Sequence, residues 1–228
     1  MTVSVAKQAA AERAVEYITD GMIVGLGSGS TSELAIEAIA RRVREGLQIK
    51  AVASSKKSEA LAREGGIPII PFSQVESIDL NIDGADEVDA FFHLIKGGGG
   101  AHLREKVLAY NSRRFVVIVD DSKLVDQLGK FPLPVEIVPF AYELTVKNLA
   151  GLGCRPVIRK DKDDNYLTDN GNWIADCHFS VIANPEKLEQ SLKQIPGVVE
   201  TGLFSAMADF IVVGYGDGTV KEIVVKPE

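Results

Sequence analysis

Apolar and polar positions follow two regular patterns along the first 130 residues. In residues 4–18 apolar side chains recur at helical spacing among charged ones, whereas Met22–Leu26 is an unbroken apolar run typical of a buried strand. The two patterns then take turns, which predicts strands near 22–26, 49–53, 67–70, 77–83, 91–95 and 115–119, and helices over 4–18, 30–43, 56–64 and 101–110. Strands that alternate with helices form a mostly parallel sheet, so we expect a Rossmann-like α/β domain.

The pattern changes beyond Lys130, where FPLPVEIVPF holds three prolines in ten residues. Strands and helices are then predicted in the order β-α-β-β-α-β, which is the ferredoxin-like α+β order. The Asn-Gly pair in Thr168–Asn172 predicts a hairpin turn after a short extra strand at Tyr166. The runs Phe210–Tyr215 and Val220–Val225 predict two strands that return to the first domain. We therefore expect an α/β domain over 1–130 plus 207–228 and a smaller ferredoxin-like domain over 131–206.

Three loops follow predicted strand ends, at Gly27–Thr31, Asp83–Glu87 and Lys96–Gly100. Ligands of parallel α/β sheets bind at the carboxyl ends of the strands, so these are candidate binding loops. The first loop leads into a helix, and Ser30 with Glu33 three residues later forms the pattern of a capping box. Helix-start N–H groups, glycines and three hydroxyls suit a phosphate. A tight turn with an ordinary cap accounts for the loop about equally well.

A dinucleotide-binding loop fits this stretch poorly. The third glycine of G-x-G-x-x-G would fall at position 30, which is serine. The following strand ends in Ser54, Ser55 and Lys56 instead of an acid that could bind a ribose, and no P-loop Gly-Lys-Ser/Thr follows the glycines. An oxidoreductase that uses a nucleotide cofactor is therefore a weak alternative.

The second loop concentrates acids, because Asp83, Asp86 and Glu87 fall within five positions, with Gly84 and Ala85 between them. A single Asp-Gly is typical of a turn. Three crowded carboxylates repel one another and raise one another's pKa values, which suits proton transfer. Mg²⁺ bound through these acids is the rival interpretation, and sensitivity to EDTA would reveal it.

The third loop adds a cation. Lys96 opens the run Gly97, Gly98, Gly99 at a strand end, where an ammonium and backbone N–H groups can stabilise a developing oxyanion. An ordinary exposed lysine is the alternative.

The helix after this loop offers a base. Arg104, Glu105 and Lys106 are consecutive and sweep about 200° around a helix, so at least one of them turns inward. The side chain of Glu105 tilts back toward the glycines, and a partly desolvated carboxylate with a raised pKa suits a general base. A surface glutamate paired with a lysine is the alternative.

Composition narrows the possible partners. The net charge of -7 and pI near 5.1 argue against nucleic acid, while a small anion needs only a few local donors. No apolar run reaches membrane-spanning length, and the N-terminus lacks the layout of a signal peptide, so a cytoplasmic location is expected. Cys154 and Cys177 lie far apart and should be small buried hydrophobes, and the three histidines form no metal-binding pair.

Several motifs together carry a resemblance. GLGSGST, DGADE, KGGGG followed by REK, DDSK at Asp120–Lys123 and GKFPLPVE from Gly129 look like ribose-5-phosphate isomerases of type A, and the similarity continues through TDNGN and IPGVVETGLF. The family often has Thr at position 28 and Ala at position 100, where this chain has Ser28 and Gly100. The resemblance implies interconversion of ribose 5-phosphate and ribulose 5-phosphate through an enediol, without metal or cofactor, in a homodimer or homotetramer.

The same resemblance implies roles for individual residues. Glu105 would move a proton between C1 and C2, and Asp83 would help shuttle protons on the oxygens. Lys96 and Asp86 would hold and polarise the carbonyl or ring oxygen. The substrate-binding set would comprise Ser28, Gly29, Ser30, Thr31, Gly84, Ala85, Gly97, Gly98, Gly99 and Lys123, with Lys7 as a further candidate for the phosphate.

One alternative of a different class is a sugar-phosphate sensor without catalysis, since such a sensor could share this α/β domain. A regulator should also carry a basic helix-turn-helix segment, and the residues before Met22 leave no room for one.

Overall fold

The computed structural model describes residues 2–225, and their contacts group into two compact units. Unit 1 comprises Met1–Ala85, Arg104–Lys123 and Met207–Glu228, and unit 2 comprises Asp86–Leu103 and Leu124–Ala206. This grouping places 86–103 and 124–130 with the smaller unit, whereas the smaller domain predicted from the sequence spans 131–206. The predicted domain limits stay a prediction.

Unit 1 is built on a six-stranded sheet with the strand order β15-β14-β6-β3-β1-β2. All neighbouring strands are parallel except the C-terminal β15, which pairs antiparallel with β14. The last two strands thus return to the first domain, as predicted. The strands are β1 (Ile23–Leu26), β2 (Lys50–Ala53), β3 (Leu80–Gly84), β6 (Phe115–Asp120), β14 (Phe210–Gly214) and β15 (Val220–Val224).

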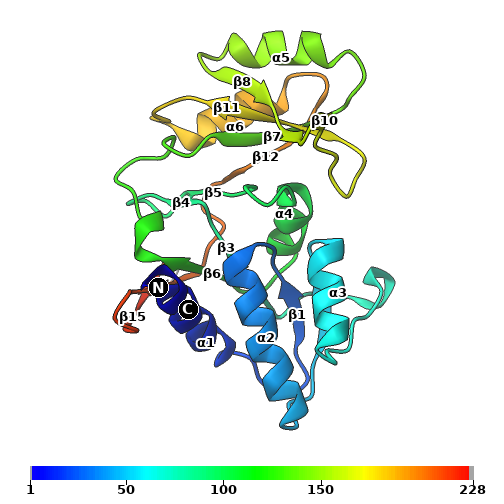
Figure 1. Cartoon of the computed structure of the whole chain (residues 1–228), viewed down its shortest axis with the longest axis vertical. Helices are drawn as coiled ribbons and strands as arrows, with labels where there is room; N and C mark the ends of the chain where they lie inside the picture. Colours follow the sequence, from blue (N-terminus) through cyan, green and yellow to red (C-terminus); the bar gives the residue numbers. More distant parts are fainter. Residues whose placement is uncertain (1, 226–228) are drawn as a thin grey trace. The chain divides into compact units, whose positions relative to one another are not determined.

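Helices cover both faces of this sheet (Figure 1). One core joins apolar residues of α1 (Thr2–Val15), α2 (Ser30–Arg44) and α3 (Lys56–Glu64) to alternate strand residues, including Leu80 and Ile82 of β3. The opposite face carries a smaller cluster in which Leu108 of α4 (His102–Tyr110) packs with Val52 and Ile78. This two-faced burial is what a parallel sheet requires and confirms the predicted α/β layer.

The predicted strand over 67–70 is wrong. Only one isolated bridge forms there, between Ala51 and Ile69, and it is followed by a short 3₁₀ helix, Phe72–Gln74. Pro68 lacks an N–H group and can only accept, from Ala51 N at 2.8 Å. Pro71 cannot donate either, so the ladder stops after one bridge.

The main sheet of unit 2 has the order β12-β7-β11-β8 with every neighbouring pair antiparallel. Together with its two helices this is the ferredoxin-like arrangement expected from the sequence. Leu149 of α5 and Leu192 of α6 share one core with the inward residues of the strands. The elements are β7 (Leu133–Ile137), α5 (Tyr142–Ala150), β8 (Arg155–Ile158), β11 (Trp173–His178), α6 (Pro185–Lys193) and β12 (Val198–Thr201).

Two small sheets complete unit 2. A three-stranded sheet joins β4 (Glu87–Val88), β5 (Leu94–Ile95) and β13 (Leu203–Phe204) in antiparallel pairs. A hairpin of β9 (Lys160–Asp161) and β10 (Asp164–Asn165) ends just before Tyr166, so the extra strand predicted at Tyr166 lies slightly earlier. Both cysteines are buried in the core of this unit, as expected.

None of the helices in residues 2–225 combines the length and the apolar character needed to cross a bilayer.

Candidate active site

In unit 1 the site begins with Asp83, which stands at the end of β3 and is fully buried. Its Oδ1 accepts hydrogen bonds from Ser28 N at 3.0 Å, Ser32 Oγ at 2.9 Å and its neighbour Gly84 N at 2.8 Å. These three donors converge on one oxygen and therefore fix the plane of the carboxylate.

A glycine makes this position possible. A Cβ on Gly27 would overlap the Asp83 carboxylate and lie 2.6 Å from Asp83 Cα. Gly25 is constrained in the same way, because its Cβ would lie 3.1 Å from Asn81 Cγ. The glycines of the first loop thus accommodate side chains of the neighbouring strand β3.

A cluster of serine hydroxyls lies at the carboxyl ends of β1 and β2. Ser28 Oγ is 2.8 Å from both Ser54 Oγ and Ser55 Oγ, and Ser58 Oγ donates to Gly27 O at 2.7 Å. Ser55 also caps α3 by accepting from Ser58 N at 3.1 Å. Hydroxyls beside the starts of α2 and α3 form a suitable lining for an anion.

The start of α2 differs from the predicted capping box. Its N-cap is Gly29, with φ 99°, and no side chain caps the helix. Because Gly29 adopts this left-handed φ, Ser30 becomes the first helical residue and its hydroxyl accepts from Lys7 Nζ at 2.9 Å. Glu33 pairs instead with Lys57. The loop Ser28–Thr31 therefore combines helix-start amides with a nearby cation.

Glu105 lies in the first turn of α4 and is 3% exposed. The last turn of α4 adjoins the start of β3, where Ile78 N donates to Asn111 O at 3.1 Å. Because the helix runs back against the parallel strands, its first turn points toward their carboxyl ends. Leu108, one turn further along, packs against the sheet, so Glu105 faces the sheet as well.

Asp83 shares this face of the sheet. Leu80 and Ile82 point into the core beneath α1 and α2, so Asn81 and Asp83 point to the opposite face by the alternation of strand side chains. That is the face α4 covers. Unit 1 therefore presents two buried carboxylates, Asp83 and Glu105, on one side of its sheet.

Lys123 belongs to the same edge. It ends the short 3₁₀ helix Asp121–Lys123 directly after β6, which is the neighbour of β3, and its side chain is half-buried. The preceding residue Asp120 is buried and accepts from Ser122 N at 3.1 Å, which tightens the turn that places the lysine.

Unit 2 contains a separate group of candidate residues around Asp86 and Lys96. A backbone hydrogen bond joins their segments, because Asp86 N donates at 2.7 Å to the carbonyl of Ile95, the residue before Lys96. Lys96 N in turn donates to Gly202 O at 2.8 Å. The Lys96 side chain is 2% exposed, and its Nζ lies 5.4 Å from the centre of the Phe204 ring. Lys96 is thus a buried cation and not the ordinary surface lysine.

The glycine run forms a tight turn in which Gly100 N donates to Gly97 O at 2.9 Å. Gly98 N donates to Asp86 Oδ2 at 2.7 Å, and a Cβ on Gly98 would lie 2.6 Å from Asp86 Oδ1. Gly97 has φ 103° and lies against the buried His102 ring, since its Cβ would lie 2.7 Å from Nδ1. The run is therefore shaped to hold the Asp86 carboxylate against the backbone.

The Glu87 carboxylate, unlike those of Asp83 and Asp86, binds the backbone of a later loop. Its buried carboxylate accepts from Gly129 N at 2.7 Å and Phe131 N at 2.5 Å, so it anchors the following loop. Within residues 2–225, no three His, Cys, Asp or Glu side chains are grouped as ligands for a metal ion. The crowding of three acids in the sequence thus resolves into separately bonded carboxylates.

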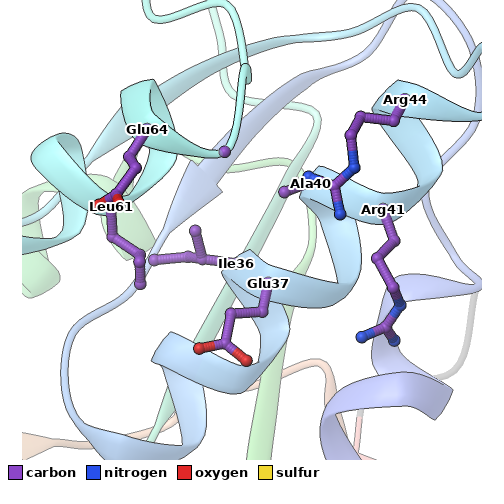
Figure 2. Close-up of a pocket in the computed structure, with 8 residues that line it drawn as sticks. Ile36, Glu37, Ala40, Arg41, Arg44, Leu61 and Glu64 are labelled. Carbon is purple, nitrogen blue, oxygen red and sulfur yellow. The ribbon is translucent and has the colours of Figure 1, made fainter.

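A groove of about 300 Å³ elsewhere on unit 1 is separate from these residues. It lies between α2 and α3 and is lined by Ile36, Ala40 and Leu61, with Glu37, Arg41, Arg44 and Glu64 at its rim (Figure 2). These residues come from the middle and C-terminal parts of both helices, and none of them belongs to the hydroxyl cluster at the helix starts.

Comparison with known proteins shows the family of the chain. The model of the family "Ribose 5-phosphate isomerase A (phosphoriboisomerase A)" matches residues 50–218. The chain belongs to this family.

Relatives match over nearly the whole chain. A ribose-5-phosphate isomerase A of Thermoplasma acidophilum is 52% identical over 215 residues, which cover 93% of this chain and 89% of the relative. Ribose-5-phosphate isomerase A 1 of Oceanobacillus iheyensis is 49% identical over 212 residues, covering 92% and 95%.

Solved structures of the family share the fold. Ribose 5-phosphate isomerase A of Methanocaldococcus jannaschii superposes with a TM-score of 0.91 at 42% identity, covering 96% of this chain and 97% of that one. A D-ribose-5-phosphate isomerase in complex with phospho-erythronic acid gives 0.94 at 39% identity, covering 98% and 100%. The mixed α/β fold and the family resemblance seen in the sequence are confirmed.

The structure also identifies site residues that sequence reasoning missed in this member of the ribose-5-phosphate isomerase A family. Ser32 bonds the Asp83 carboxylate, and Ser55 and Ser58 bond Ser28. The available signal was the serine pair at the end of the second predicted strand, directly before a helix start. In the sequence this pair indicates only that the ribose-binding acid of a dinucleotide site is missing. Ser32 had no signal, because its contact with Asp83 spans 51 residues.

Proposed function

We propose that this chain interconverts D-ribose 5-phosphate and D-ribulose 5-phosphate by proton transfer through an enediol, with Glu105 as the base. A carbon-bound proton is weakly acidic, so the reaction needs a base at carbon and a positive group at the oxygen that gains charge. The buried Glu105 supplies the base and the buried Lys96 supplies the positive charge.

Asp83 and Asp86 act on the oxygens of the sugar. Asp83 shuttles protons between the oxygens at C1 and C2, because its orientation is fixed by three hydrogen-bond donors. Asp86 works with Lys96 to hold the carbonyl or ring oxygen, and Gly84, Ala85 and the amides of Gly97–Gly99 line the substrate. A fixed carboxylate needs no rearrangement at the moment of proton transfer.

The phosphate end is held by Ser28–Thr31 and Lys123. Amides at the start of α2 carry partial positive charge, and Lys123 adds a full charge at the neighbouring strand end. Lys7, which reaches Ser30 Oγ at 2.9 Å, is a further phosphate ligand.

The observation that carries this proposal is the pair of buried carboxylates on one face of the unit 1 sheet, beside a helix start lined with hydroxyls. A protein that only senses a sugar phosphate needs the hydroxyls but gains nothing from burying two acids, since burial disfavours the charged form. The comparisons give no support to the sensor alternative.

The decisive experiment is an assay for ketose formation from ribose 5-phosphate, without nucleotide cofactor and with EDTA. We expect turnover in wild type, strong loss in Glu105→Gln, and no effect of EDTA. Binding of ribose 5-phosphate by wild type without any ketose would support the sensor instead. Activity that EDTA abolishes would support Mg²⁺ at the acids.

We further propose a cytoplasmic location and a homodimer or homotetramer. The location is the one expected from the sequence, and the assembly is the one that the family resemblance implies. Sedimentation of the purified chain would test the assembly.

A further inference from the structure

The glycine run of unit 2 is held by side chains that the sequence did not connect to it. Arg159, just after β8, donates through Nη1 to Gly97 O at 3.0 Å and to Gly98 O at 3.1 Å. The hydroxyl of Tyr166 donates to Gly99 O at 3.3 Å. The carbonyls of Gly97–Gly99 thus point toward two side chains of unit 2. Arg159 follows strand β8, and Tyr166 follows the β9–β10 hairpin.

Arg159 is itself held rigidly. Its Nε and Nη2 donate to the two carboxylate oxygens of Asp176 at 2.9 and 2.6 Å, and the two side chains are only 15% and 21% exposed. A two-pronged pair of this kind fixes the guanidinium plane as well as its position. The Tyr166 ring lies 5.7 Å from Arg159 Cζ, which covers the remaining face.

Fixing the carbonyls also fixes the amides. In a trans peptide the N–H of the next residue points opposite to the carbonyl, so the amides of Gly98 and Gly99 are directed away from Arg159, and the amide of Gly100 is directed away from Tyr166. Gly98 N donates to Asp86 and Gly100 N to Gly97 O. Gly99 N has no protein acceptor among residues 2–225, and Gly99 borders open space.

Tyr166 also explains why residue 100 is a glycine. This glycine has φ 81°, and a Cβ there would lie 2.6 Å from Tyr166 Cζ. The tyrosine ring thus occupies the space that any side chain at position 100 would need. Burial raises the pKa of Tyr166, so the hydroxyl keeps the proton that it donates to Gly99 O.

We propose that Arg159, oriented by Asp176 and assisted by Tyr166, is a positioning residue that sets the peptide planes of Gly97–Gly100. It thereby directs the Gly99 amide toward a substrate oxygen and keeps Asp86 bonded to Gly98. This role rests on the proposed function, because it matters for turnover only if the loop binds the reacting sugar.

The test compares Arg159→Ala, Arg159→Lys and Tyr166→Phe with wild type in the ribose 5-phosphate assay. Loss of loop geometry should lower kcat of Arg159→Ala by about 10- to 100-fold, with a smaller change in KM. Lysine keeps the charge but cannot serve Asp176 and two carbonyls together, so Arg159→Lys should be intermediate. Tyr166→Phe removes one hydrogen bond and should show the smallest loss.

Hydrogen exchange separates positioning from general damage. In Arg159→Ala the peptide containing Gly97–Gly100 should exchange faster, while the helices α5 and α6 keep their protection. The matched control is Arg155→Ala at an exposed arginine that begins β8, four residues before Arg159, and it should leave kcat and loop exchange unchanged.

Wild-type kcat in folded Arg159→Ala would overturn the proposal, as would lost kcat with unchanged exchange of the loop. If Arg159→Ala does not fold, Arg159→Lys decides: wild-type kcat and exchange in that variant refute the role, and a partial loss supports it. A wild-type protein that makes no ketose would instead refute the proposed function itself.

Discussion

Gly27 fits closely against Asp83 in unit 1, and Gly27→Ala should therefore damage both stability and turnover. The new Cβ would overlap the Asp83 carboxylate and lie 2.6 Å from Asp83 Cα. Rotation of the side chain cannot relieve the backbone contact, because β3 is hydrogen-bonded to β1 on one side and to β6 on the other. Either β3 or the loop after β1 must move.

The cost can be worked from these contacts. Overpacking a rigid site costs about 1–3 kcal/mol, and losing one hydrogen bond to a charged group costs about 1.5–3 kcal/mol. One of the three donors to Asp83 must be lost if the carboxylate shifts, so the combined cost is about 2.5–6 kcal/mol, and about 3 kcal/mol is a conservative figure. For a chain of this size that lowers Tm by roughly 6–12 °C. Displacing a proton-transfer group by about 1 Å should also lower kcat by about 10²-fold.

Thermal unfolding and turnover of Gly27→Ala measure both effects. Gly84→Ala is the stability control at the same strand end, since its Cβ would meet only ordinary contacts at 3.7 Å. In an Asp83→Ala background the stability cost of Gly27→Ala should shrink by about 1 kcal/mol or more, because the carboxylate is gone. An equal cost in both backgrounds, or an unchanged Tm in the single variant, would refute the reasoning.

Three further predictions concern other groups. Glu105→Gln should still bind ribose 5-phosphate but lose about 10²- to 10⁴-fold in kcat, and a near-normal kcat would remove Glu105 as the base. Lys123→Ala should raise KM for ribose 5-phosphate through the lost phosphate contact, and an unchanged KM would exclude that lysine from the site. The hydrogen bonds from Arg13 and then Tyr17 lower the pKa of Glu222 from 4.5, so its contribution to stability is present at neutral pH and is lost as the pH falls below that value. Glu222→Gln should therefore lower Tm slightly at pH 7, by an amount limited by solvent screening, and the difference from wild type should shrink as the pH falls below 4.5; a difference that stays constant over that range would contradict this account.

Elements with a regular apolar pattern could be predicted from the sequence. The helix over Lys56–Glu64 has the predicted limits, and the β-α-β-β-α-β order of unit 2 was visible in its apolar runs. The exceptions have local causes. The strand over 67–70 failed because Pro68 and Pro71 remove the donors that a ladder needs, which the apolar run alone does not reveal.

For the candidate site, the sequence predicted where the loops lie but not the hydrogen bonds inside them. The loops could be located because each follows an apolar strand, and the resemblance assigned their residues. The bonding inside them could not, because it depends on residues far apart in sequence. Ser32 contacts Asp83 across 51 positions, Arg159 contacts Gly97 across 62, and Glu87 holds Phe131 across 44. A one-dimensional pattern shows that Glu87 is acidic but not that its partners are the backbone amides of Gly129 and Phe131.

The contacts of Gly25 and Gly27 explain why the loop after β1 resembles a dinucleotide-binding loop in sequence but differs from one in structure. In that fold the glycines admit a pyrophosphate close to the backbone. Here Gly25 faces Asn81 and Gly27 faces Asp83, so the space without a Cβ is occupied by side chains of β3. Unit 2 uses the same solution independently, since Gly98 faces Asp86 and donates its amide to that carboxylate. An aspartate that must hold a fixed orientation in a buried site needs backbone donors at close range, and only a glycine opposite it leaves room for that approach. The spacing of glycines and acids in the sequence therefore reflects these paired contacts, which a dinucleotide motif does not require.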